Sequence, residues 1–305
     1  QSLNREWDAI WDVRTRRTAE GWIAEFAIPF KSLGFRNDRL VWGFNISRTI
    51  MRKIEEVRWA APRLDIRFFQ VSEAGELNGF SDLEQGVGLD VRPYLSGNWL
   101  HRGATGDDAL TGDRGGDLFY NITPNLKLTA TINTDFGETE VDARQINLSR
   151  FPLFFPEKRA FFLENAAVFS FAGSGGNNPD ALPFFSRRIG LLEGRAIPIL
   201  AGAKLTGKVG RYDVGFLNVR TREAAGVDAK NLVVARVKRN ILRQSYIGGI
   251  FTGGDPARPA SSQTYGADLR LATANFLGGR RNFDLSTYFL QTRRPGVERD
   301  ANVGG

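Results

Sequence analysis

The chain has 305 residues, of which 42% are hydrophobic and 25% charged, and its formal net charge is +7. This apolar content can supply a core, which excludes a disordered protein, and the lack of cysteine excludes disulfides, thiol nucleophiles and Cys-ligated metals. No apolar run reaches the roughly 18 to 20 residues of a membrane-spanning helix, whereas a barrel strand needs only about 9 to 11 alternating residues.

Residues 1–62 are predicted to form antiparallel strands of a soluble β-sandwich. In WDAIWDVRT the apolar residues alternate with polar ones, which is the pattern of a half-buried strand, and GWIAEFAIPF, LVWGFNI and EEVRW continue it. Trp22 and Trp42 are predicted core residues, while Trp7 and Trp11 are candidates for stacking on sugar rings. The opening QSLNREWDAIW shows neither an initiator Met nor a signal peptide, so we expect a fragment or a processed chain.

Residues 63–85 lose this alternation and contain the turn-like pair Asn78-Gly79, so they are predicted to be a linker. From residue 86 to residue 305 the predicted strands are longer, and short turns alternate with long polar loops. In an outer-membrane barrel the short turns lie on the periplasmic side and the long loops outside. Tyr212 and Phe216 are then expected to face lipid, with Asp213 and Gly215 facing the lumen. A soluble sandwich or propeller, which also shows alternation, is the alternative.

Two connections in this part need separate treatment. The Gly-rich stretch from His101 to Gly116 is predicted to be a long outer loop. Between the predicted strands at 126–133 and 197–206 an even number of strands is required; we place two there, near 139–149 and 161–171, with FPLFFPEKRA as a periplasmic turn. The same segment could instead fold into the lumen as a plug.

Two sets of segments resemble known families. IPFKSLGF followed by LVWGFNISR resembles the final strands of the family 9-like carbohydrate-binding domain. NTDFGETEVDARQINLSRFPLFFPEKRAFFLEN, FFSRRIGL and PILAGAKLTGKVGRYDVGFLNVRT resemble the outer-membrane β-barrel domain of unknown function 5916. The resemblance implies a Gram-negative surface protein in which a periplasmic glycan-binding-like module precedes a barrel. Some relatives carry the label "membrane-associated hydrolase". Against the family pattern, the first module lacks its N-terminal half and the barrel is incomplete.

The expected fold class is therefore all-β: a partial β-sandwich (jelly-roll-like) module in residues 1–62, a linker in 63–85, and an antiparallel, incomplete transmembrane β-barrel in 86–305. The expected location is the bacterial outer membrane, with the N-terminal module in the periplasm. Outer-membrane lipid and a carbohydrate ligand are the expected partners. Nucleic acid is not expected, because the 41 Lys and Arg are scattered among 34 acidic residues. The sequence does not indicate an oligomeric state.

The only candidate catalytic carboxylates are Glu138, Glu140 and Asp142, which share one face of a predicted strand. They could serve as a glycosidase acid/base pair, hold Ca²⁺, or form a lumenal charge ladder with arginines. Asp107, Asp108 and Asp113 are candidate Ca²⁺ ligands, although their spacing does not match an EF-hand. No other cofactor is expected.

One aromatic-flanked motif is predicted to be structural. A proline opens it, an acid and bases can satisfy its backbone, and phenylalanines anchor both ends at the bilayer edge. A docking or assembly signal is the alternative. The motif comprises Phe155, Pro156, Glu157, Lys158, Arg159, Phe161, Phe162 and Glu164.

Three functions remain open. The leading one is a non-enzymatic outer-membrane barrel that binds or passes glycan-derived ligands through a polar lumen. The second is a membrane-associated carbohydrate-active hydrolase that cleaves O-glycosyl bonds. The third is a structural or assembly barrel.

Overall fold

The computed structural model describes residues 11–33, 35, 40–62, 68, 73–83, 88–102, 107–134, 157–172, 181–192, 195–224, 226, 228–242, 245–256, 262–273, 277, 283–296 and 300–304. In these residues the fold is all-β, as predicted, and α1 (Ala160–Leu163) is the one α-helix. No helix in the described ranges has the length and apolar character needed to cross a lipid bilayer. The chain divides into two compact units, Asp8–Val87 and Gly88–Gly305.

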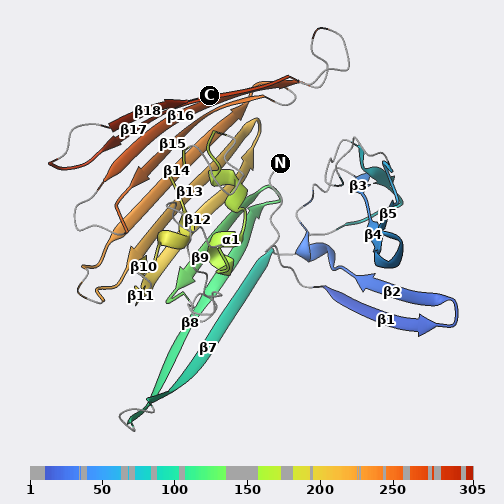
Figure 1. Cartoon of the computed structure of the whole chain (residues 1–305), viewed down its shortest axis with the longest axis horizontal. Helices are drawn as coiled ribbons and strands as arrows, with labels where there is room; N and C mark the ends of the chain where they lie inside the picture. Colours follow the sequence, from blue (N-terminus) through green and yellow to red (C-terminus); the bar gives the residue numbers. More distant parts are fainter. Residues whose placement is uncertain are drawn as a thin grey trace. The chain divides into compact units, whose positions relative to one another are not determined.

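The first unit contains three two-stranded antiparallel sheets (Figure 1). Two of them are hairpins of neighbouring strands and the third joins strands further apart in the sequence. The pairs are β1 (Asp12–Thr18) with β2 (Gly21–Ala27), β4 (Ser47–Ile50) with β5 (Glu55–Arg58), and β3 (Trp42–Phe44) with β6 (Gly75–Leu77). The 3₁₀ helices η1 (Phe30–Ser32) and η2 (Met51–Lys53) lie between strands. Because β6 pairs with β3, part of the expected linker is a strand of this unit.

Aromatic rings form the packed centre of the first unit. The ring of Trp42 lies 4.7 Å from that of Phe80, 5.0 Å from that of Phe35 and 5.7 Å from that of Phe30, but its side chain is half-buried, so its prediction as a core residue is confirmed only in part. Trp22, in contrast, is 54% exposed, so its prediction as a core residue is wrong. The reason is that β1 and β2 pair only with each other in the described part of the chain.

The second unit is built on one ten-stranded antiparallel sheet, with order β18-β17-β16-β15-β14-β13-β12-β9-β8-β7. Its strands have from 5 to 17 residues, and in the described part of the chain β7 and β18 are its two edges. The bounds are β7 (Leu89–Arg102), β8 (Asp107–Thr123), β9 (Leu126–Ile132), β12 (Ile199–Val209), β13 (Tyr212–Thr221), β14 (Asn231–Asn240), β15 (Tyr246–Gly253), β16 (Gln263–Thr273), β17 (Phe283–Arg293) and β18 (Asp300–Gly304).

Residues 101–102 and 107–116 are not a loop but belong to β7 and β8. The ladder between β7 and β8 continues without a shift from Leu89↔Tyr120 to Arg102↔Asp107, so the prediction of a long outer loop is wrong. Glycines and aspartates suggested a loop, but their backbone groups are paired across the hairpin, which satisfies them as a strand does.

β9 and β12 are neighbours in the sheet and pair directly in antiparallel register. The strand predicted near 161–171 is wrong. These residues form α1 and the 3₁₀ helix η4 (Ala166–Phe169), and the chain continues through η5 (Ser186–Arg188) and the short pair β10 (Leu191–Leu192) and β11 (Arg195–Ala196). The strand predicted near 139–149 lies outside the described residues.

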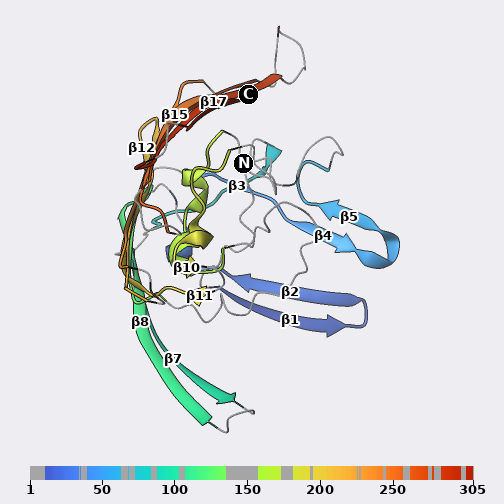
Figure 2. The same ribbon diagram turned by 60° about the vertical axis from the view of Figure 1, so that its left-hand side comes forward.

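Residues 157–172 and 181–190, which we call the inner segment, lie against the concave face of the curved sheet (Figure 2). The described residues therefore pack on the sheet and do not extend it, while their place in a lumen stays a prediction. The hydrophobic core of the unit is formed between the two, by Phe161, Phe162, Phe169, Phe171 and Ile189 of the inner segment and by strand residues such as Ile199, Leu217, Val219, Leu232, Val234, Ile250 and Leu290.

Candidate functional site

The two faces of the large sheet differ sharply in charge. We call the concave face, on which the inner segment lies, the inner face, and the opposite one the outer face. The inner face carries every aspartate and lysine whose side chain is described in these strands. By register they are Asp90, Asp113, Asp117, Lys127, Lys204, Lys208, Asp213, Lys238, Asp268 and Asp284. The outer face carries Tyr212 and Phe216, which are 43% and 46% exposed, and Tyr265, which is 45% exposed. The predicted alternation of faces is confirmed for these strands.

Glycines on the inner face make room for the phenylalanines of the inner segment. A Cβ atom at Gly202 of β12 would lie 2.9 Å from Cζ of Phe161, and one at Gly266 of β16 would lie 2.9 Å from Cε2 of Phe171. At Gly215 of β13 it would lie 2.9 Å from Cγ1 of Val168 and 3.0 Å from a ring carbon of Phe169. Real Cβ atoms rarely approach so closely, so these rings need glycine beneath them.

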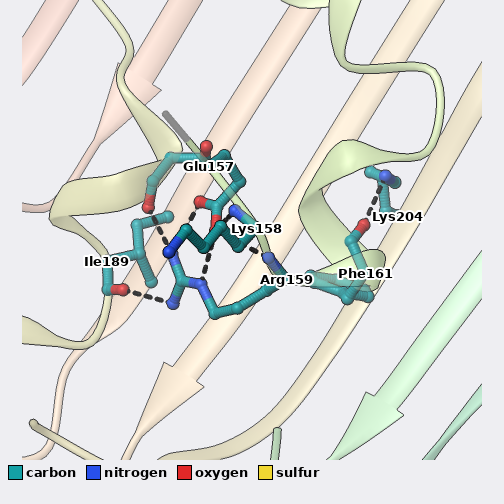
Figure 3. A network of polar contacts seen from close by, with 7 residues as sticks. Glu157, Lys158, Arg159, Phe161, Ile189 and Lys204 are labelled. Atoms are coloured by element: carbon teal, nitrogen blue, oxygen red, sulfur yellow. Dashed lines mark hydrogen bonds and ion pairs between the residues drawn. The ribbon is translucent and has the colours of Figure 1, made fainter. Parts of the chain in front are cut away.

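Arg159 holds the two parts of the inner segment together (Figure 3). Its guanidinium pairs with Glu157 through Nε–Oε1 at 2.8 Å and Nη2–Oε2 at 2.7 Å. The same group donates to the carbonyl oxygen of Ile189 at 2.7 Å and to that of Ser186 at 2.9 Å, and it lies 4.1 Å from the ring of Phe162. Arg159 is only 3% exposed, so this is a buried cation that is paired and hydrogen-bonded within the inner segment.

The carboxyl group of Glu157 is adapted to this partner. Burial alone would raise its pKa, but hydrogen bonds and charge from Arg159, with a further hydrogen bond from Ser186, outweigh burial and hold the pKa below its ordinary value of 4.5. Glu157 therefore stays ionised at neutral pH, which favours a structural role over that of a proton donor.

Two lysines of the large sheet bind the segment around α1. Lys204 of β12, 1% exposed, donates to the carbonyl oxygen of Phe161 (Figure 3) and to that of Glu164. Lys127 of β9 forms an ion pair with the Glu164 carboxylate at 2.8 Å. A positive charge at the carbonyl end of a helical turn is electrostatically favourable, so these contacts fix the end of α1 on the sheet.

A buried ion pair of the large sheet binds the backbone of the segment after η4. Arg236 of β14 and Asp268 of β16 form two hydrogen bonds of 2.6 and 2.7 Å, with side chains 0% and 1% exposed. Their remaining groups bind the inner segment: Nε of Arg236 donates to the Ser170 carbonyl at 3.1 Å, and Oδ2 of Asp268 accepts from the Ala172 amide at 2.9 Å. The buried charges of the wall are thus engaged in holding backbone, which leaves them in fixed positions.

The predicted structural motif is only partly described. Phe155 and Pro156 lie outside the described residues. Glu157, Lys158, Arg159, Phe161, Phe162 and Glu164 do anchor structure, but as part of the inner segment and not as a turn at the bilayer edge, so the predicted turn is wrong in this part. Burial of Phe161 and Phe162, 0% and 3% exposed, is the physical reason.

The other candidates are placed as follows. Glu138, Glu140, Asp142 and Trp7 lie outside the described residues. Trp11 is 47% exposed and its ring stacks on Phe26 at 5.9 Å. Asp107 and Asp108 belong to β8, and Asp113 of β8 accepts a hydrogen bond from the Asn133 side chain. In the part of the chain that the structure describes, no three His, Asp or Glu side chains gather as metal ligands would.

A pocket of about 510 Å³ lies between the inner segment and the sheet, at the end where the longer loops are. Residues 181–189 form one wall, and the ends of β14, β15, β16, β17 and β18 form the other. Phe184 and Phe185 supply aromatic surface, Thr252, Thr264 and Thr292 supply hydroxyl groups, and Arg188 and Arg294 supply positive charge. The size is within the range of about 300 to 1,000 Å³ that is usual for ligand pockets.

The sequence arguments missed the residues that hold the inner segment and line this pocket. Lys204, Arg236 and Asp268 could have been suspected, because each is a charge at an inward position in the middle of its strand, flanked by apolar or small residues. Arg188 and Arg294 gave no such signal, since they lie just outside the predicted strands.

Comparison with known proteins adds one match. No curated protein and no solved structure matches the chain. No match to a family 9-like carbohydrate-binding domain is found, so that resemblance stays a prediction. Residues 86–201, which run from the start of the large sheet through the inner segment into β12, match the family described as "Domain of unknown function (DUF5916)".

Proposed function

We propose that the large sheet is the wall of an outer-membrane β-barrel, with its outer face toward lipid and the inner segment in the lumen, and that the protein binds glycan-derived ligands at the mouth of that lumen. The proposal combines the predicted location with the chemistry of the two sheet faces.

The observation that carries the proposal is the segregation of charge. All described aspartate and lysine side chains of the ten strands face inward, and the only charged side chains described on the outer face are the arginines Arg114, Arg220, Arg239 and Arg293. Arg220, Arg239 and Arg293 lie at or next to strand ends, and Arg114 lies beyond the end of β9. A charged group at the bilayer midplane is costly, whereas arginine near the interface can reach polar headgroups.

The connections support one orientation. The two tightest connections, 124–125 and 210–211, both lie at one end of the sheet, where the nine-residue connection 274–282 also lies, and the nine-residue connections 222–230 and 254–262 lie at the other end. The chain enters β7 at the tight-turn end, where Leu89 pairs with Tyr120. With tight turns on the periplasmic side, as in known barrels, the residues before β7 would also be periplasmic.

The arrangement of the inner segment favours binding of a ligand in the lumen over free diffusion of the ligand through it. The inner segment is held by the ion pair of Lys127 of β9 with Glu164 and by hydrogen bonds from β12, β14 and β16 to its backbone, so it obstructs the concave side of the sheet. The pocket beside it offers two phenylalanines and several hydroxyl groups, a combination that suits a sugar, whose ring has an apolar face and a polar edge.

The lack of cysteine allows a direct test of membrane exposure. Single cysteines would be introduced at the outward positions Val214 and Phe216 and, as matched controls on the same strand, at the inward positions Asp213 and Leu217. After fluorophore labelling and reconstitution of the full chain in vesicles, we expect quenching by lipids with brominated acyl chains at the outward positions only. Equal quenching at both sets, or a folded protein that stays in solution without detergent, would contradict the proposal.

A further inference from the structure

The pocket at the loop end of the sheet has an unusual balance of charge. Its described lining contains two arginines and one carboxylate, that of Asp255. Arg188 comes from η5 of the inner segment, and Arg294 directly follows β17. Two cations from separate parts of the fold therefore line one cavity.

Neither arginine is neutralised within the described residues. No ion pair or hydrogen bond joins the Arg188 or Arg294 side chain to any described residue, and the buried Nε–H group of Arg294 has no acceptor there. This contrasts with Arg159 and Arg236, whose guanidinium groups pair with Glu157 and Asp268 and donate further hydrogen bonds to backbone carbonyl oxygens. A buried donor without an acceptor is costly, and a bound ligand would relieve that cost.

We propose that this pocket binds a saccharide that carries a carboxylate, with Arg188 and Arg294 as the residues that hold the acid group. The planar guanidinium presents paired N–H donors that match a carboxylate, and such charge-assisted hydrogen bonds are stronger than neutral ones. Phe184 and Phe185 provide surface for the sugar ring, and the threonine hydroxyls can bond its oxygens. The inference deepens the proposed function, on whose glycan ligand it rests.

The test uses the full chain in detergent micelles and three probes, measured by calorimetric titration. Digalacturonic acid is the acidic probe, and the galactose disaccharide of the same linkage is its neutral match. Inorganic phosphate is the third probe, because guanidinium groups also bind phosphate. We expect digalacturonic acid to bind at least about tenfold more tightly than the neutral disaccharide, since a charged hydrogen bond contributes about that factor or more.

The variants are Arg188→Gln and Arg294→Gln, with Arg220→Gln as the matched control. Arg220 is an exposed arginine on the outer face of β13, so its loss removes the same charge elsewhere. Each pocket variant should weaken binding of digalacturonic acid by about tenfold to a hundredfold, and the control should leave it unchanged. Because Arg188 is exposed, its variant is expected to fold, and Arg188→Lys should recover part of the affinity.

The other outcomes separate the two proposals. Equal binding of both disaccharides, unaffected by the pocket variants, overturns the acidic ligand but leaves glycan binding in place. Binding of phosphate alone, lost in both pocket variants, overturns the saccharide and with it the glycan part of the proposed function. Absence of binding by all three probes overturns the proposed site, while the test of membrane exposure stands independently.

Discussion

Individual charges on the inner face differ in how deeply they depend on a partner. Arg236 and Asp268 are almost completely buried, whereas Arg270 and Asp284, which also pair across the sheet, are 35% and 50% exposed. Removing one member of a buried pair leaves the other desolvated and unpaired, which costs about 3 to 5 kcal/mol. An exposed pair contributes only about 0 to 1 kcal/mol.

We therefore predict that Arg236→Met lowers the free energy of unfolding by about 3 to 5 kcal/mol. The matched variant Arg270→Met should lower it by about 1 kcal/mol or less. Urea unfolding of the refolded protein in detergent, followed by tryptophan fluorescence, measures both. Similar losses in the two variants would show that the buried pair does not hold the inner segment as the contacts indicate.

Glu157 gives the inner segment a predicted dependence on pH. Its pKa is held below 4.5 in the folded protein by Arg159, against the opposing effect of burial. A carboxyl group with a lowered folded pKa stabilises the fold fully above its unfolded pKa, and this contribution is lost as pH falls toward the folded pKa. The difference in unfolding free energy between the wild type and Glu157→Gln should thus be constant from pH 7 to about pH 5 and shrink below that. A difference that grows on acidification would contradict the assignment.

At the scale of elements, the inner segment depends on glycines in the strands beneath it. A Cβ atom at Gly215 would come within 3.0 Å of Val168 and Phe169, while one at Gly249 of β15 would meet only a backbone oxygen at 3.6 Å. We predict that Gly215→Val displaces the segment around η4. Gly249→Val places the same side chain on the outer face and should leave the segment in position.

Limited proteolysis with trypsin measures this displacement, because Lys158 and Arg159 are cleavage sites at the start of the inner segment. Cleavage there should be about tenfold or more faster in Gly215→Val, which corresponds to a loss of at least about 1.4 kcal/mol in local stability. Unchanged cleavage in Gly215→Val, or equal acceleration in Gly249→Val, would mean that the ring contacts do not position the segment.

The strands of the large sheet could be predicted because alternation reports burial directly. In β13, the sequence YDVGFLNVRT places Tyr212 and Phe216 on the outer face and Asp213 and Gly215 on the inner face, as found. Parity also predicted the direction in which β12 runs. It could not tell that residues 161–171 are not a strand of the sheet, because it reports only whether a number of strands is even.

Residues 161–171 were mispredicted for a physical reason. In FFLENAAVFSF apolar residues stand at both odd and even positions. This is the characteristic pattern of neither a half-buried strand nor an amphipathic helix. Phe161, Phe169 and Phe171 instead fit over single glycines of β12, β13 and β16, which lie far away in the sequence. The inward-facing glycines were also visible in the sequence, but only the fold shows that they make room for these phenylalanine rings.

At the scale of the whole molecule, the site is made of contributions that no single segment contains. The groups that hold the inner segment come from four strands of the sheet, and the pocket adds residues from η5 and from the end of β17. The first unit shows a similar limit: Trp42 packs with Phe80, beyond the expected domain boundary at residue 62. Alternation within each strand predicted the strands of the large sheet. The positions of the inner segment and of the pocket depend instead on contacts between residues from distant strands.

The membrane assignment predicts a dependence on depth across the outer face. Phe216 lies midway along β13, between Tyr212 beside a tight turn and Arg220 at the loop end, whereas Val209 is the last residue of β12 at the tight-turn end. Phe216→Lys should therefore destabilise the protein in lipid vesicles by about 2 to 4 kcal/mol, and Val209→Lys by about 0 to 1 kcal/mol. Urea unfolding from vesicles measures both variants. If water bathed this face, the two lysines would cost similar and small amounts, because neither would be taken out of solvent.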